Sequence, residues 1–279
     1  MQAGVPSNLK NPDSTGNYIC YANSSLQSFF NLPGFDRYLQ SKTSTENEQQ
    51  RNLADRLLNL YNTVRAGQKG DASPVVDMVM EGNPSGKSYQ QAANFIERLF
   101  GILEQGNADA YKEQLNMISV GETTPINTIF QNNFQGYFFV SSYPLGQILN
   151  KQREGKLNQL MEMANIPESG RAAYIQKINN YNEYCISKII YWNTGHYVSE
   201  IKIGQGWYSI NDLGKIEKIK QPRIEIQKTI ATPRYETIVE GQTIVEESQR
   251  ITETVEFLIM TDNFVTELYN KIKEIIDVV

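Results

Sequence analysis

The stretch Asn17–Phe30 (NYICYANSSLQSFF) constrains this chain most, because it places a cysteine after a loop and at the start of a helix. Loop-forming residues precede it at 11–16. Its apolar residues recur at the 3.6-residue period of one helix face, at Ala22, Leu26, Phe29 and Phe30. A thiol at a helix N-terminus faces unpaired N–H groups, which favour the thiolate. The stretch predicts a helix over 20–31 that carries a nucleophilic Cys20; a cysteine that only packs against a core is the alternative.

A base and an orienting group follow far downstream. The chain has one histidine, His196, which lies 176 residues after Cys20 (196 − 20), and Asn211 lies 15 residues further on (211 − 196). A cysteine protease needs a base that takes the thiol proton and a third group that fixes the imidazole tautomer. Cys20, His196 and Asn211 supply these side-chain types in an order that occurs in convergent forms of the catalytic triad.

Three motifs carry a resemblance to a known family. Gly16–Gln27 is similar to the cysteine box of the ubiquitin-specific proteases, the papain-like deubiquitinases, and Gly195–Asp212 is similar to their histidine box. Between them, Tyr89–Ile96 (YQQAANFI) resembles the glutamine-rich helix start of the same family. The three motifs occur in the family's order and span most of the chain.

The resemblance implies an α+β fold of the papain-like cysteine peptidase kind, with a helical thumb packed on an antiparallel β-sheet palm and reduced fingers. Residues 1–115 are expected to form the thumb with Cys20, and residues 116–279 the palm with His196, within one catalytic domain. Residues 219–252 are interpreted as an insertion of unknown function. The implied activity is that of a thiol-dependent isopeptidase that removes ubiquitin or a ubiquitin-like modifier.

The resemblance also implies roles in the reaction. Cys20 attacks the carbonyl of a C-terminal glycine, and His196 takes the thiol proton and later protonates the leaving amine. Asn211 is favoured over Asp212 as the third member, because successive strand side chains point to opposite faces and at most one faces His196 unless the strand ends there. An ideal hairpin that turns at Gln205 pairs Ile203 with Trp207 and Ser199 with Asn211.

Two further sets of site residues come from the same resemblance. The oxyanion donors expected are Asn17 or Asn11, together with the backbone N–H of Cys20. The residues expected to bind the modifier's tail are Gln90, Gln91, Asn94, Gly195 and Tyr197. Gln91 and Asn94 stand where the family has carboxylates, so recognition of tail arginines is expected to be weaker. For Tyr197, packing on the sheet is an equal alternative.

Composition limits the other function classes. A net charge of −5 argues against nucleic acid as the main ligand. Two cysteines and one histidine cannot build a structural zinc cluster, so we expect neither a metal nor a cofactor. Without a basic-then-apolar leader or an apolar run of about 18 residues, the sequence predicts no membrane association and a cytoplasmic location, or a host cytosol if this is a microbial effector.

Periodicity and turn residues predict the elements. Helices are expected over 46–66 with a cap among Thr43, Ser44 and Thr45, over 74–80, from Ser88, over 145–166 and 171–180, and from Asn263. Strands are expected over 127–130, 136–141, 186–191, 197–203, 207–210 and 255–259, with a hairpin of 235–239 and 243–246. Residues 4–19 are expected to be loop.

Two other functions fit parts of the sequence. A catalytically weak module that binds a ubiquitin-like protein fits the altered oxyanion loop and the missing carboxylates, but leaves the retained Cys20, His196 and Asn211 unexplained. An unrelated cysteine acyltransferase or hydrolase fits the three side chains but not the glutamine-rich motif.

Overall fold

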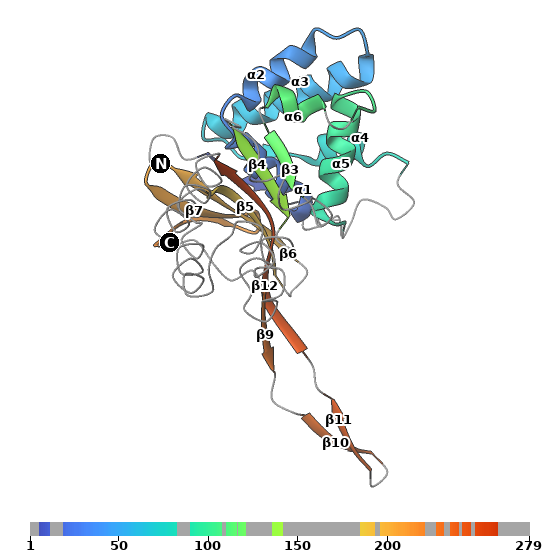
Figure 1. Cartoon of the computed structure of the whole chain (residues 1–279), viewed down its shortest axis with the longest axis vertical. Helices are drawn as coiled ribbons and strands as arrows, with labels where there is room; N and C mark the ends of the chain where they lie inside the picture. The colour runs from blue at the N-terminus through green and yellow to red at the C-terminus, as the bar shows by residue number, and fades with distance from the viewer. Residues whose placement is uncertain are drawn as a thin grey trace, which may run out of the picture.

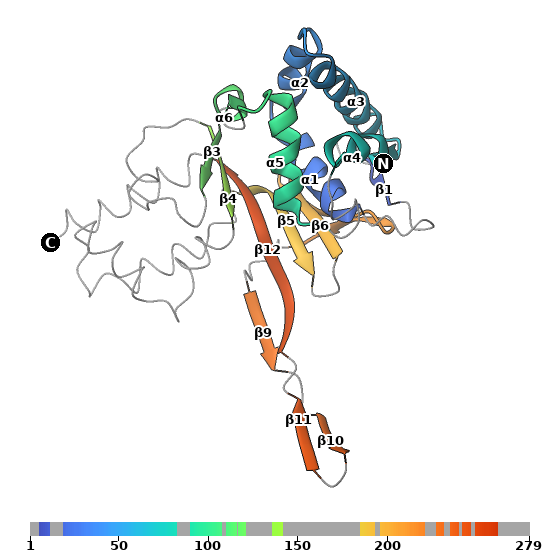
Figure 2. The ribbon, with the colours of Figure 1, turned by 90° about the vertical axis from the view of Figure 1, so that its right-hand side faces the viewer.

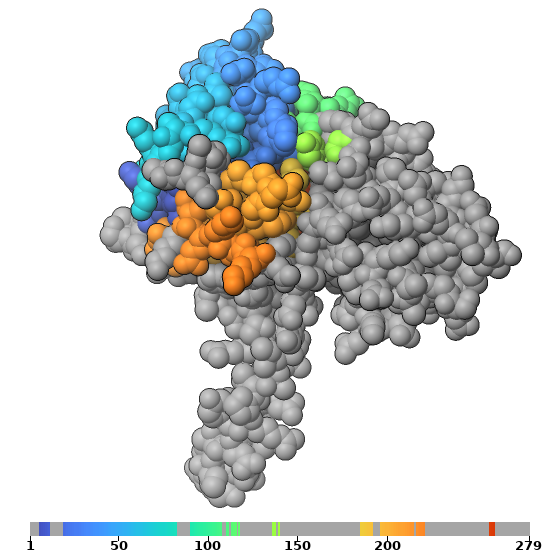
Figure 3. Space-filling view, turned by 90° about the vertical axis from the view of Figure 1, so that its left-hand side faces the viewer, coloured from blue at the N-terminus to red at the C-terminus, as the bar shows by residue number. Residues whose placement is uncertain are grey.

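The structure is a computed structural model that describes residues 6–11, 19–82, 90–107, 110–115, 117–120, 136–141, 185–192, 196–220, 227–231, 235–239, 242–246 and 249–261. Helices gather on one side of a long, mostly antiparallel sheet, and a narrow β-arm extends away from both (Figures 1 and 2). On the face shown in Figure 3, strands of the 200–220 region (orange) lie directly against the N-terminal helices (blue and cyan). The predicted mixture of helices and an antiparallel sheet is confirmed.

The described helices are α1 (Cys20–Phe30), α2 (Phe35–Thr43), α3 (Glu48–Arg65), α4 (Ser73–Val79), α5 (Ala92–Leu103) and α6 (Ala110–Gln114). The helices predicted over 20–31, 46–66 and 74–80 are confirmed to within two residues. The cap of α3 is Asn47, whose side chain accepts from the N–H of Gln50, and not one of the three residues expected. Helix α2 was not predicted: Gly34, at φ 85°, lets the chain turn straight into a new helix.

The main sheet has the strand order β3-β4-β12-β5-β6-β7-β8, and β9 pairs with the free end of β12. These strands are β3 (Met117–Val120), β4 (Tyr137–Ser141), β5 (Cys185–Trp192), β6 (His196–Ile203), β7 (Gly206–Asn211), β8 (Lys215–Ile219), β9 (Gln227–Ala231) and β12 (Gln249–Thr261). The pair β3–β4 is parallel and the other pairs are antiparallel. The strands predicted within 136–141, 186–191, 197–203, 207–210 and 255–259 are confirmed.

Other predicted elements have different outcomes. Residues 4–19 are not all loop, because Leu9–Lys10 forms a short strand (β1) parallel to Gly70–Asp71 (β2). Strand β3 was not predicted. The helix predicted from Ser88 is present as α5, but it begins at Ala92 with Gln91 as its N-cap. Ser88 itself, the strand over 127–130 and the helices over 145–166, 171–180 and from Asn263 lie outside the described residues.

The register predicted for the β6–β7 hairpin is wrong by one residue. Ile203 pairs with Gly206 and Ser199 pairs with Ile210, so the turn contains two residues, Gly204 and Gln205. Glycine at φ 58° suits such a tight turn. A slip by one residue changes the face to which every side chain of a strand points. Here it moves Asn211 to the face of the sheet that carries His196.

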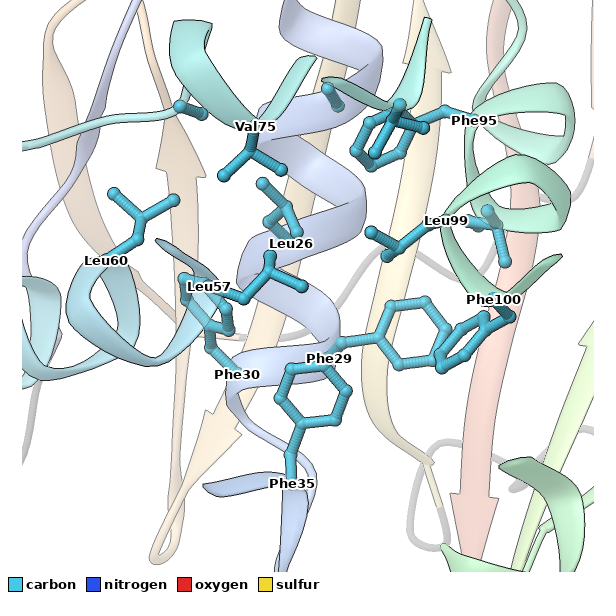
Figure 4. Packing of buried hydrophobic residues seen from close by; sticks show 14 of the residues in the cluster. Leu26, Phe29, Phe30, Phe35, Leu57, Leu60, Val75, Phe95, Leu99 and Phe100 are labelled. Carbon is cyan, nitrogen blue, oxygen red and sulfur yellow. The ribbon is translucent and has the colours of Figure 1, made fainter. Parts of the chain in front are cut away.

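Helix α1 is buried on all sides, and not on one face as its periodicity predicts. None of its residues is more than 4% exposed. Phe29 packs against the rings of Phe35, Phe100 and Phe139 at centroid distances of 5.8, 5.1 and 5.7 Å. Figure 4 shows side chains from α3, α4 and α5 surrounding the helix. Such a helix forms the centre of a core instead of a boundary with solvent.

Buried polar side chains of α1 and its C-cap make hydrogen bonds both within the helix and to neighbouring segments. Ser24 and Ser25 donate to carbonyls one turn back in the helix, at 2.8 and 2.7 Å. Gln27 donates to the carbonyl of Ser7 at 3.0 Å. At the far end, Asn31 donates to the carbonyl of Ile186 on β5 at 2.9 Å. Because an unpaired buried polar group is costly, the bond of Gln27 fixes the helix to the N-terminal segment and the bond of Asn31 fixes it to the sheet.

Within the described residues, no helix has the length and apolar character that a membrane crossing requires.

Two glycines give a matched test of how tightly the core around the helices is packed. A Cβ on Gly70 would lie 2.5 Å from Leu60 and 2.9 Å from Leu9, whereas a Cβ on Gly101 in α5 would meet no atom within 4 Å. We expect Gly70→Ala to lower the free energy of unfolding by about 1–3 kcal/mol through overpacking. We expect Gly101→Ala to raise it by about 0.5–1 kcal/mol, because alanine favours a helix interior. Urea denaturation measures both, and changes of the same sign would contradict the packing.

Candidate active site

The sulfur of Cys20 lies where helix α1 begins against strand β6. Cys20 is the first residue of α1 and is 4% exposed. The backbone N–H groups of Tyr197, Tyr21 and Cys20 itself lie near its thiol and lower the pKa of that thiol. Tyr197 directly follows His196 on β6, so the contact brings the thiol beside the histidine's own stretch of backbone. Converging N–H groups of this kind stabilise negative charge at the place where they meet.

Burial nevertheless decides the protonation of this thiol. Loss of hydration is the largest effect on this pKa, the backbone N–H groups lower it, and the nearby charge of Asp212 raises it. The net result is a pKa of about 11 for Cys20. The sequence-based prediction that the helix N-terminus favours the thiolate is therefore wrong, because burial outweighs the N–H groups. A helix N-terminus lowers a thiol pKa only if the thiolate keeps enough solvation, and here it does not.

His196 is oriented by Asn211. The His196 Nε2 atom lies 3.0 Å from Asn211 Oδ1, which also accepts the backbone N–H of Leu213 at 2.9 Å. Because the N–H of Leu213 can only donate, the amide oxygen must face this side. His196 Nε2 then carries the proton, and the neutral ring presents Nδ1 as its basic nitrogen. Among the described residues this is the base-and-orienter arrangement that a triad needs.

Asp212 also reaches the imidazole. Its Oδ1 lies 3.4 Å from His196 Nε2 and its Oδ2 accepts from Asn23 at 2.7 Å. Both Asn211 and Asp212 approach His196 because β7 ends at Asn211 and a turn follows, so strand alternation no longer separates them. Burial raises the pKa of Asp212, and the hydrogen bond from Asn23 and the charge of His196 oppose that rise.

Asn23 is a site residue that the sequence analysis did not single out. Its amide donates to Asp212 and, at 3.1 Å, to the carbonyl of Lys10. It lies three residues after Cys20 on the same helix and is 2% exposed. One side chain thus links the cysteine helix to the carboxylate beside His196. The available signal was an amide side chain one turn after the cysteine, on the same helix.

The structure places the remaining predicted residues in different surroundings. Asn11 lies near Asp212 and lowers the pKa of that carboxyl. Gln91 is the exposed N-cap of α5, Asn94 is exposed on its first turn, and Gln90 is half-buried just before it. Asn17 and Gly195 lie outside the described residues.

Tyr197 is buried between the sheet and the start of α5. Its ring lies 4.9 Å from that of Tyr191, and its hydroxyl accepts the N–H of Ala92 at 3.5 Å. In the described part of the chain, no group of three or more His, Cys, Asp or Glu side chains lies close enough together to hold a metal ion.

The link between Asn23 and Asp212 can be measured. We expect Asn23→Leu to lower the free energy of unfolding by about 1–3 kcal/mol, because it leaves a buried carboxyl and a carbonyl without their donor. In a double-mutant cycle with Asp212→Leu, the coupling should be about 0.5–3 kcal/mol. Ser28→Ala on the same helix is the control, because the Ser28 hydroxyl is buried without a hydrogen-bond partner among the described residues. Additive effects in urea denaturation would contradict the link.

Comparison with known proteins adds independent evidence. No curated relative matches the chain. Residues 13–143, which include Cys20, Asn23 and the glutamine-rich start of α5, match the family model described as ubiquitin carboxyl-terminal hydrolase. Over this part, which carries the cysteine motif and the helices around it, the chain is similar to the ubiquitin carboxyl-terminal hydrolase family.

Proposed function

We propose that this protein is a thiol-dependent isopeptidase of the ubiquitin-specific protease kind, which removes ubiquitin or a ubiquitin-like modifier by Cys-His-Asn catalysis. Two features together carry the proposal. His196 Nε2 lies 3.0 Å from Asn211 Oδ1, and the residue after His196 on β6, Tyr197, has its backbone N–H near the thiol of Cys20. The family match covers the cysteine and its helix, and this geometry supplies the base and its orienter from outside the matched range.

In the proposed reaction, His196 Nδ1 takes the proton of the Cys20 thiol as the sulfur attacks the carbonyl carbon of the modifier's C-terminal glycine. The carbon–nitrogen bond then breaks, and the imidazolium returns its proton to the leaving amine. Water, deprotonated by the same imidazole, attacks the thioester carbonyl and releases the modifier's carboxylate and the thiol. The backbone N–H groups near Cys20 support the oxyanion, with Asn17 or Asn11 as further donors.

The buried Asp212 carboxylate supports the imidazolium stage. A neutral amide such as Asn211 orients the ring but adds no charge, whereas a carboxylate 3.4 Å from Nε2 stabilises the cation by Coulomb attraction. We therefore assign the orienting role to Asn211 and an electrostatic role to Asp212. Gln90, Gln91, Asn94, Gly195 and Tyr197 remain the proposed contacts for the modifier's tail.

The proposed function includes a division of the chain into two lobes. Residues 1–115 form a thumb and residues 116–279 a palm with reduced fingers, in the papain-like arrangement. Two hydrogen bonds support this division, because each joins the α1 region of the helical part to the β-rich part: Asn31 to Ile186 on β5, and Asn23 to Asp212 after β7.

A covalent probe tests the reaction. Ubiquitin with a C-terminal propargyl amide should label the protein at Cys20, and Cys20→Ala should abolish the labelling. Cys185→Ala is the matched control, because Cys185 is the other cysteine and is fully buried on β5. His196→Ala should lower kcat/KM on a ubiquitin–aminocoumarin reporter by about 10²- to 10⁴-fold. Ubiquitin binding without labelling or turnover would instead identify a binding module.

The raised pKa of Cys20 predicts an unusual pH dependence. In the Cys185→Ala background, the rate of alkylation of Cys20 by iodoacetamide should rise about tenfold per pH unit from pH 8 to 10, without a plateau, because the thiol pKa is about 11. The folded protein keeps this proton where the unfolded chain has lost it. The resulting stabilisation is fully present below about pH 9 and is lost as the pH rises toward 11. A plateau near pH 8 would show that the thiolate is already populated at neutral pH.

A further inference from the structure

The segment interpreted as an insertion forms a two-stranded arm, made of β9, β10 (Tyr235–Val239), β11 (Gln242–Glu246) and residues 249–254 of β12. The hairpin predicted from 235–239 and 243–246 is confirmed, with Val239 opposite Gln242. Nearer the body, β9 pairs with β12, as in Ile230 with Arg250. The second half of β12 lies between β4 and β5. A central strand of the main sheet therefore continues into the arm and anchors it.

The arm leaves the sheet at the level of the histidine. Glu253 on β12 pairs with Trp192 on β5, and Trp192 pairs with His196 on β6, so the three residues form one row across the sheet. From this row the arm extends away from the helices, and β10–β11 lies at its far end (Figures 1 and 2). The five residues of β11 and residues 249–253 of β12 follow one another along the arm, and together they account for about 33 Å at the usual strand rise.

This reach matches the size of a small folded protein. A domain of about 80 residues has a radius of gyration near 12 Å and is about 30 Å across. A domain of that size, with its C-terminal tail at Cys20, could lie along the arm for its whole width. The geometry therefore fits a partner that the arm and the active site hold at the same time.

The outer half of the arm is an incomplete structure by itself. Among the described residues, β10 and β11 form a ladder only with each other. A lone two-stranded ribbon is marginally stable in water, and its edges offer unpaired backbone groups. Four of the ten residues in these strands are isoleucine or valine: Ile238, Val239, Ile244 and Val245. A ribbon of this composition gains stability when another protein covers it.

Charge indicates the chemistry of that protein. The sequence from Tyr235 to Ser248 contains four glutamates and no lysine or arginine. A second copy of the arm would bring like charges together, which disfavours self-association. A partner with a basic and apolar surface is complementary to both features.

We propose that the arm binds the folded body of the modifier, along a basic and apolar surface, while the modifier's tail occupies the site at Cys20. This inference rests on the proposed function. It assigns the 219–252 insertion to substrate binding and not to the chemical steps.

Shortening the arm tests the proposal. Residues 232–248 are replaced by Asn-Gly, which closes a tight turn between Ala231 and Gln249, two residues that already pair. A second variant, Glu236→Lys with Glu246→Lys, reverses charge at the tip without deletion. Asp55→Lys with Glu113→Lys is the matched control on exposed positions of α3 and α6. Two reporters share an aminocoumarin leaving group: intact ubiquitin, and a peptide of its last residues.

We expect both arm variants to raise KM for intact ubiquitin by at least about tenfold, with kcat and peptide cleavage unchanged, and the control variant to behave like the unaltered chain. An unchanged KM for ubiquitin overturns the proposal. An equal loss of kcat/KM on both reporters also overturns it. So does light scattering that shows the unaltered protein as a dimer and the deletion variant as a monomer. If the intact protein turns over neither reporter, calorimetry of Cys20→Ala with ubiquitin decides: weaker binding on shortening the arm supports the arm's role even though the proposed reaction fails. Equal or absent binding ends it.

Discussion

The architecture depends on one helix that is buried on every side. Helix α1 has helices against part of its surface and strands β5 and β6 against the rest, so neither layer is complete without it. Its apolar side chains fill the core, and its polar ones hydrogen-bond outward to the N-terminal segment, to β5 and to Asp212. Because the cysteine is the first residue of this helix, the position of the thiol is set by the packing of the whole core.

The register of one hairpin has an equally direct effect on the site. A two-residue turn at Gly204 and Gln205 places Asn211 on the face of His196, and the end of β7 immediately afterwards brings Asp212 within reach as well. A three-residue turn would have reversed these faces. The orientation of the imidazole is thus a consequence of turn geometry, through the period of two that governs strand side chains.

Two opposing effects act on the thiol. Backbone N–H groups from α1 and β6 favour the thiolate, and burial favours the thiol by a larger amount. The protein therefore has a preorganised place for negative charge that is not charged at neutral pH. In the proposed reaction this arrangement suits a nucleophile that loses its proton to His196 only during attack, and it keeps the sulfur unreactive toward other electrophiles in the meantime.

The sequence by itself determined the elements with strong local signals: the cysteine helix, the helix of 46–66, the strands around His196 and the hairpin of the insertion. It also determined which three side chain types are available for a triad, since the chain has only one histidine. Periodicity and turn residues are local, and they suffice for such features. The burial of α1 on all sides, the parallel pairing of β3 with β4 and the contact of Asn23 with Asp212 depend on segments far apart in the chain. The raised pKa of Cys20 belongs with these, because desolvation is decided by what surrounds the sulfur in space and not by its neighbours in sequence.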